Sequence, residues 1–97
     1  MEAQFTGGED SLFLFISNET KFPEFATEEN ITGICYVEFV ILPSGIVSNA
    51  HMLKTEHPVL DYEAIRVVNA MPVWQPAKSM GKEVSSTYKM PFRFTLK

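Results

Sequence analysis

The clearest pattern along the chain is a run in which every second position is hydrophobic. Residues 31–42 place Cys35, Val37, Phe39 and Ile41 on one side and a more mixed set on the other. A period of two over this length predicts a β-strand, and the uniformly apolar side is the one expected to point inward.

A turn and a returning strand are expected next. The sequence LPSG at 42–45 has proline at the second turn position and glycine at the fourth, which is typical of a type I turn. A second strand is expected over 46–54. Its apolar residues do not share one parity, so we expect a β-bulge near Ser48 and Asn49 to reconcile them.

Helical spacing is found on both sides of this hairpin. Residues 8–18 carry an apolar stripe. At its start, Thr6 and Glu9 have the spacing of a capping box. A short helical turn is expected around 23–29. A longer amphipathic helix starts at Pro58 and ends before Pro72. Its apolar face is made of Leu60, Ala64, Val67, Val68 and Met71.

The last alternating run, 82–97, predicts one long strand. One parity is mostly apolar: Val84, Ser86, Tyr88, Met90, Phe92, Phe94 and Leu96. Pro91 lies within the run and cannot donate to a ladder, which favours a sheet edge or a bulge. Gly81 is expected to permit the bend that starts the strand. The exposed edge would be guarded by Lys89 and Arg93.

These elements predict an α+β fold. A right-handed crossover through the long helix places the last strand antiparallel beside the first, which gives a three-stranded antiparallel sheet in the order 2-1-3. Helices are expected on one face of it. The 97 residues, 45% hydrophobic, suit one domain over 1–97. We expect a helical extension over 1–30 and a ββαβ core over 31–97.

The charge pattern excludes one class of partner and leaves two interpretations. A net charge of −4 argues against nucleic-acid binding. Seven acids in residues 1–30 oppose one base. Five bases in residues 78–97 oppose one acid: Lys78, Lys82, Lys89, Arg93 and Lys97 against Glu83. The charges are either ordinary solubilising groups or two faces of opposite sign, with the basic one on the last strand.

No catalytic, cofactor or metal site is predicted. The spacing of His51 and His57 is not that of a zinc site. Asp61 and Glu63 are two apart on a helix and do not face each other. Cys35, the only cysteine, lies in an apolar strand and is interpreted as a small buried hydrophobe. We therefore expect a protein that is not an enzyme.

Trp74 stands between Pro72 and Pro76, in a segment suited to neither helix nor strand. We expect it to pack under the sheet and to anchor the crossover into the last strand. The alternative is direct contact of Trp74 with a partner.

The ordered set of motifs resembles the C-terminal domain of TonB proteins, in the form found in Bacteroidetes-type members. The resemblance covers about residues 5–97. An upstream part consists of Gly7-Gly8-Glu9 and Phe22-Pro23 followed by Ala26. The main part consists of Leu60-Asp61, Glu63-Ala64, Arg66, Val68, Met71-Pro72, Trp74, Pro76-Ala77, Gly81-Lys82, Val84, Tyr88, Pro91 and Phe94.

The resemblance implies a periplasmic domain of an energy transducer that is anchored to the inner membrane. Such domains bind the TonB box of outer-membrane receptors by β-strand addition to the last strand. The full-length protein would couple to the inner-membrane ExbB/ExbD motor for the uptake of siderophores, vitamin B12 or glycans.

The residues expected to take part fall into two groups. The partner-binding candidates are Lys82, Val84, Ser85, Ser86, Thr87, Tyr88, Lys89, Met90 and Arg93. The structural anchors are Trp74, Pro76, Gly81 and Pro91. Two alternatives stay open: an interaction module of a membrane sensor or peptidase, and a domain that forms a homodimer by pairing its last strand.

Overall fold

The computed structural model describes residues 1–94, and for Phe25 the backbone only. The sequence predictions for Leu96 and Lys97 lie outside the described residues. The elements, in chain order, are α1 (Glu9–Glu19), α2 (Glu24–Glu28), β1 (Gly33–Ile41), β2 (Val47–Lys54), α3 (Pro58–Asn69), β3 (Ala77–Ser79), β4 (Lys82–Val84) and β5 (Ser86–Phe94).

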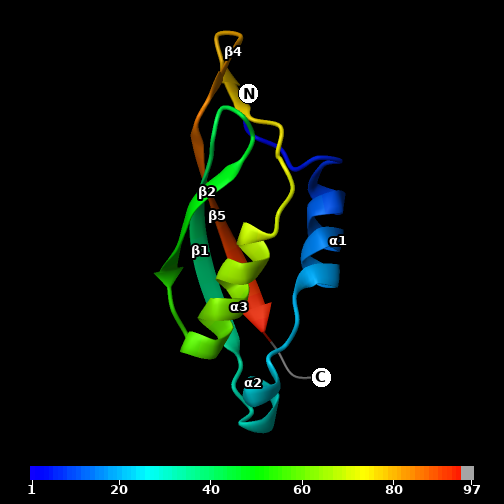
Figure 1. Ribbon diagram of the computed structural model, residues 1–97, viewed down its shortest axis with the longest axis vertical. Coiled ribbons are helices and arrows are strands. Elements are labelled where there is room, and N and C mark those ends of the chain that lie inside the picture. The colour runs from blue at the N-terminus through cyan, green and yellow to red at the C-terminus, as the bar shows by residue number, and fades with distance from the viewer. Residues whose placement is uncertain (95–97) are drawn as a thin grey trace.

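The main sheet has the strand order β2-β1-β5 with antiparallel neighbours, so the predicted 2-1-3 topology is confirmed. Helix α3 crosses one face of this sheet (Figure 1). The other face carries no helix in the described part of the chain. Strand β5 forms one outer edge, as Pro91 led us to expect. No helix among residues 1–94 is long and apolar enough to span a membrane.

The β1–β2 hairpin follows the sequence prediction closely. The turn is closed by the Gly45 N–H donating to the Leu42 carbonyl over 2.7 Å. The register shifts opposite residues 48–51, because Val40 pairs with Ser48 whereas Glu38 pairs with His51. This is the predicted bulge. A second shift, between the pairs of Tyr36 and Val37, was not predicted.

The core lies between α3 and the sheet. The four inward residues predicted for β1 are fully buried, as are four of the five predicted for the helix: Cys35, Val37, Phe39, Ile41, Leu60, Ala64, Val67 and Val68. Burial, together with a hydrogen bond to Asp61, raises the pKa of the Cys35 thiol to about 12. The thiol is therefore protonated at neutral pH and packs as an apolar group.

The start of α1 differs from the prediction. Gly8 is the N-cap residue and gives no side-chain cap, whereas Thr6 donates its hydroxyl hydrogen to the Val73 carbonyl over 2.7 Å. Thr6 and Glu9 therefore form no capping box. Thr6 instead ties the segment before α1 to the crossover that precedes β3. Leu12 is the one residue of α1 that is fully packed into the core.

The predicted single strand over 82–97 is wrong in its first part. Residues 77–84 form a separate two-stranded hairpin, β3–β4, with Ser79 paired to Lys82. Its turn, Met80-Gly81, has positive φ at both residues, as two-residue hairpin turns with the twist of the strands require. Gly81 therefore lies at a hairpin tip. Lys82 and Val84 pair with β3 and are not part of the edge of the main sheet.

A charged cluster on α3 holds the segment between α1 and α2 in place. The Arg66 guanidinium donates to the Glu63 carboxylate through Nε and Nη2, both over 2.8 Å. It also donates to the Glu19 carboxylate over 3.0 Å and to the Glu19 carbonyl over 2.8 Å. The Lys21 backbone N–H donates to Glu63 over 2.7 Å. Glu63, 6% exposed, is thus held by two partners.

This cluster predicts a stability that fades in acid. Burial, the largest influence, raises the pKa of Glu63, but the hydrogen bonds from Arg66 and Lys21 together outweigh it, so the pKa lies below its ordinary value of 4.5. A carboxyl of this kind stabilises the fold above its unfolded-state pKa, and the contribution is lost as the pH falls through the folded-state pKa. We expect Glu63→Gln to be less stable than the natural protein at neutral pH.

The difference between the two proteins should shrink once the pH falls below 4.5. Urea unfolding at neutral and acid pH measures it. Glu29→Gln, at an exposed position after α2, is the control and should show no such pattern. A stability difference for Glu63→Gln that is the same at both pH values would contradict the prediction.

Candidate functional site

The outer edge of β5 is open to a further strand. Pro91 pairs with Tyr36 in an uninterrupted ladder of register pairs, although it has no N–H to give. Its nitrogen must therefore face away from β1, and in an antiparallel strand alternate residues share that direction. Thr87, Lys89 and Arg93 consequently turn their N–H and C=O groups outward, and Pro91 turns a carbonyl outward.

The side chains of β5 alternate between two different surroundings. Met90, Phe92 and Phe94 are buried against the helices, and Tyr88 is half-buried. The side chains of Thr87, Lys89 and Arg93 are exposed on the other face. There the register places Lys89 opposite Glu38, and the Glu38 carboxylate lies 3.0 Å from His51 Nε2.

The predicted site residues therefore divide into three sets. Thr87, Lys89 and Arg93 offer outward backbone groups. Ser86, Tyr88 and Met90 belong to the same strand, but their backbone groups face β1. Lys82 and Val84 lie in the β3–β4 hairpin, and Ser85 joins that hairpin to β5.

Trp74 lies at the centre of an aromatic cluster behind β5. It is 2% exposed, and its ring lies 5.4 Å from that of Phe5, 5.8 Å from Phe39 and 5.0 Å from Tyr88, measured between centroids. Its backbone N–H donates to the Gly45 carbonyl over 2.8 Å. The cluster thus joins the segment before α1, strands β1 and β5, and the crossover between α3 and β3.

The N-terminal residues form a further wall beside this cluster. Gln4 and Gln75 exchange backbone hydrogen bonds of 2.9 and 2.8 Å, and the Lys78 N–H donates to the Met1 carbonyl. Residues 1–4, the N-terminal arm, thus lie antiparallel along residues 75–78. This pairing was not predicted, because residues 1–4 show no clear alternation of hydrophobic and polar positions.

Three adjoining hollows follow β5 on its outer side, and together we name them the edge groove. The first lies between the N-terminal arm and residues 84–88, and the second reaches from the arm to Trp74. The third lies between α1 and residues 88–91. Tyr88 lines all three, so the hollows form one continuous feature along the strand.

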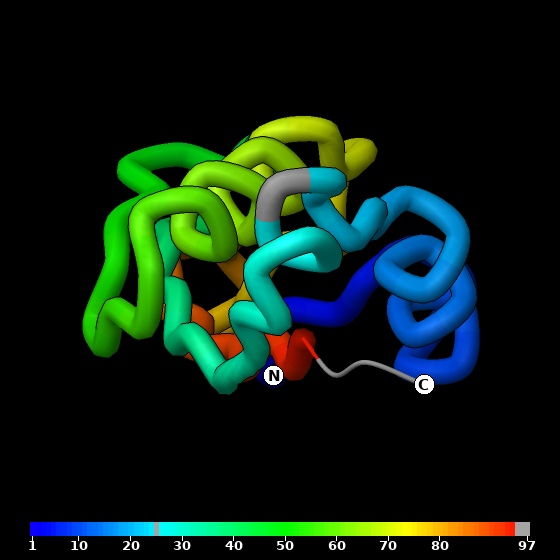
Figure 2. The backbone as a smooth tube through the Cα atoms, turned by 90° about the horizontal axis from the view of Figure 1, so that it is seen from below, coloured from blue at the N-terminus to red at the C-terminus, as the bar shows by residue number. Residues whose placement is uncertain are grey.

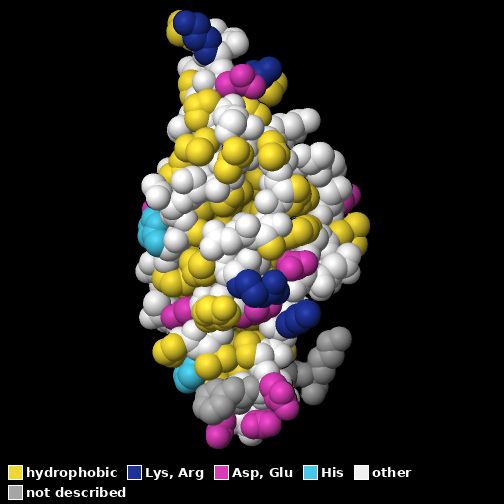
Figure 3. All heavy atoms as spheres, viewed as in Figure 1, with side chains coloured by type: hydrophobic (Ala, Val, Ile, Leu, Met, Phe, Trp, Pro, Cys, Tyr) yellow, Lys and Arg dark blue, Asp and Glu magenta, His cyan; other side chains and the backbone are white. Residues whose placement is uncertain are grey.

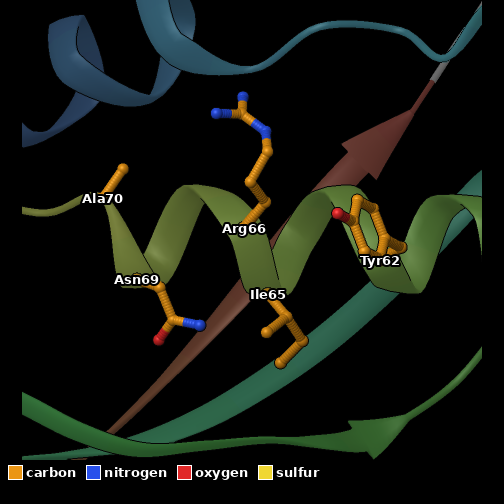
Figure 4. A pocket seen from close by; sticks show the side chains of 5 residues that line it. All are labelled: Tyr62, Ile65, Arg66, Asn69 and Ala70. Carbon is orange, nitrogen blue, oxygen red and sulfur yellow. The ribbon is translucent and has the colours of Figure 1, made fainter.

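A hollow on α3 is a weaker candidate. It has a volume of about 340 Å³ and is lined by Tyr62, Ile65, Arg66, Asn69 and Ala70. Arg66 points toward the segment after α1, whereas Ile65 and Asn69 point to the other side of the helix (Figure 4). The Arg66 guanidinium is already engaged by Glu19 and Glu63, so the hollow offers no uncommitted charge.

The face that carries α3 offers no strand edge either. Figure 3 shows hydrophobic side chains over the middle of this face, with charged side chains of both signs below them and at the upper tip. Among residues 1–94, no group of three or more His, Cys, Asp or Glu side chains could hold a metal ion. The edge groove is thus the feature that combines free backbone groups with an apolar lining.

Comparison with known proteins agrees with this reading of the fold. The sequence matches the family described as "Gram-negative bacterial TonB protein C-terminal" over residues 18–96. The chain belongs to the TonB C-terminal domain family. The resemblance inferred from the motifs is therefore confirmed, and the domain is of a periplasmic, transport-associated kind. No curated protein sequence matches the chain.

Two NMR structures of the Helicobacter pylori TonB C-terminal domain share the fold. One has a TM-score of 0.67 at 21% identity, covering 87% of this chain and 76% of the other. The second, a shorter fragment, has a TM-score of 0.64 at 22% identity, covering 93% of this chain and 97% of the other. The α+β topology of this TonB domain is thus found in solved structures.

Two of the family motif residues serve a purpose that the sequence analysis missed. Glu63 and Arg66 form the cluster that holds the end of α1 against α3. The two residues are three apart on a helix, a spacing that allows an ion pair on one face. This spacing was the signal in the sequence that could have predicted the cluster. Two further motif residues, Trp74 and Tyr88, meet in the aromatic cluster.

Proposed function

We propose that this TonB domain binds a short extended segment of an outer-membrane receptor, the TonB box, by strand addition to β5. The observation that supports the proposal is the outward backbone of Thr87, Lys89 and Arg93 at an edge that Pro91 defines. A strand that lies there gains backbone hydrogen bonds, and its alternate side chains add selectivity. The partner-binding set is thereby narrowed to residues 86–93.

The proposal extends to the complete transducer. The domain would be the periplasmic end of a protein anchored in the inner membrane, coupled there to the ExbB/ExbD motor, and it would serve active uptake of siderophores or glycans. The helical extension 1–30 and the core 31–97 would act as one domain. Phe5 and Leu12 of the extension pack in the same core cluster as β1 and α3, which favours a single unit.

The first test is an NMR titration of the labelled domain with peptides copied from the N-terminal segments of candidate receptors. We expect amide shifts concentrated at Thr87, Lys89 and Arg93. Lys89→Pro should weaken binding about tenfold, because it removes one outward donor and leaves the ladder to β1 complete. Lys89→Thr removes the same charge but keeps the N–H, so most of the affinity should remain.

Equal losses in the two variants would assign the effect to charge and would contradict strand addition. An absence of shifts with every peptide, together with a dimeric mass in light scattering, would favour the homodimer formed through β5. Binding of a different ligand class away from residues 86–93 would favour the module of a sensor or peptidase.

A further inference from the structure

Helix α1 forms the far wall of the edge groove. It stands beside β5 instead of over the sheet (Figure 1), and the view from below shows the order β2, β1, β5, α1 (Figure 2). Leu12, Phe13 and Ile16 line the hollow of about 290 Å³ that separates α1 from residues 88–91. Within residues 1–94, no backbone hydrogen bond joins α1 to β5. The helix therefore flanks the edge and leaves its donors unoccupied.

The groove-lining residues of α1 are incompletely covered. Leu12 is buried in the core and Ile16 is half-buried, but Phe13 is 59% exposed. Phe13 adjoins Ile16, Tyr88 and Met90 around one hollow, and contiguous apolar surface that is open to solvent marks interaction sites. The hollow also receives the side chains of Tyr88 and Met90 from β5. Apolar groups thus face it from both walls.

A strand added to β5 would fill this hollow with every second side chain. Successive side chains of a strand point to opposite faces of the sheet. Those on the helix side would lie beside Tyr88 and Met90 and meet Phe13 and Ile16. Those on the other side would lie beside Lys89 and Arg93, which are exposed. One side chain in two would therefore be enclosed by the domain.

We propose that α1 is the second wall of the partner site and that it selects extended segments with apolar residues at alternate positions. The proposal rests on the strand addition described under the proposed function. It assigns Phe13 and Ile16 a role in specificity and makes the partner strand amphipathic along its length.

A single extended segment fits the groove better than a second copy of this chain. Because α1 stands on the side toward which the sheet would continue, a partner strand must pass between α1 and β5 or beneath α1. A lone segment meets this requirement. A second copy would bring its own α1 beside its own β5, and the two helices would compete for the same space.

The test is selection from a random nonapeptide library displayed on phage, with the natural domain and Phe13→Glu as parallel baits. We expect the natural domain to enrich sequences with hydrophobic residues at three alternate positions. Synthetic copies should shift the amides of Thr87 and Lys89 and the methyl signals of Ile16. Their affinity for Phe13→Glu should fall about tenfold, because about half of a phenylalanine surface loses its contact.

Leu14→Glu is the matched control, since Leu14 is 63% exposed, adjacent in sequence and absent from the groove lining. It introduces the same charge and should change affinity less than about twofold. Enriched peptides that shift Thr87 and Lys89 but bind Phe13→Glu and Leu14→Glu equally would overturn the role of α1 and keep strand addition. Enrichment of no peptide, or of peptides that leave the signals of β5 unchanged, would overturn both.

Discussion

Replacing Gly45 by alanine is expected to lower the free energy of unfolding by about 3 kcal/mol. Gly45 has φ +90°, where an L side chain is strained. A Cβ at this position would collide with the carbonyl oxygen of Trp74 and lie 2.7 Å from Val73 Cγ1. Relief requires the turn to move away, which breaks the hydrogen bond from the Trp74 N–H to Gly45.

The Gly81→Ala variant distinguishes the cost of the backbone conformation from the cost of the steric collision at Gly45. Gly81 has a similar φ of +79°, but nothing lies within 4 Å of its Cβ position. Its replacement should cost about 1 kcal/mol, from the backbone conformation alone. Urea unfolding followed by circular dichroism measures both variants. Equal losses would show that the turn and Trp74 are not in contact.

Trp74→Ala should cost about 4 kcal/mol, because it empties the centre of the aromatic cluster. Trp74→Phe should cost about 1 kcal/mol. The reason for the difference is that the indole Nε1 of Trp74 is buried and has no hydrogen-bond partner among residues 1–94. A phenyl ring keeps most of the contacts with Phe5, Phe39 and Tyr88 and removes an unsatisfied donor.

Trp74 is the only tryptophan, so its variants must be followed by circular dichroism and not by fluorescence. If Trp74→Phe is as damaging as Trp74→Ala, the indole N–H contributes a hydrogen bond in solution. If Trp74→Ala is nearly neutral, the aromatic cluster does not hold the crossover to the sheet.

The sheet order and the core could be predicted because the pattern that specifies them is local. The apolar parity of β1 identifies its inward face, and one stripe identifies the inward face of α3. The handedness of the crossover then leaves a single place for the last strand. Pro91 identified that strand as an edge, since a central strand would have needed its N–H.

The β3–β4 hairpin was missed for an equally physical reason. The apolar parity of Val84 continues into Ser86 and Tyr88, so the periodicity runs across Ser85 without a break. The turn depends on a positive φ at Met80. Methionine seldom adopts this conformation, and no residue pattern in the sequence predicted it.

The place of α1 could not be predicted from its own residues. Its hydrophobic pattern is weak, and Leu12 alone is buried. Contacts with distant residues decide its position: Arg66 holds its end at Glu19, and Phe15 packs on Phe5. The backbone edge of the candidate site was thus accessible from the sequence, whereas its second wall was not.

The position of β1 between β2 and β5 has a consequence for the order in which the sheet folds. On one side β1 pairs with the strand that follows it directly, through a short turn. On the other side Ile41 pairs with Ser86 and Gly33 with Phe94, across the whole of α3 and the β3–β4 hairpin. Such distant pairings form slowly, because the entropy cost of closing a long loop precedes the stabilising contacts between the strands.

While the chain folds, the flank of β1 that faces β5 therefore stays unpaired until the residues up to Phe94 have reached it. The waiting flank belongs to the most hydrophobic strand of the sheet, and it is open to misassociation for that interval. Association between partly folded copies is therefore expected at this flank of β1 and not at the flank that β2 covers early.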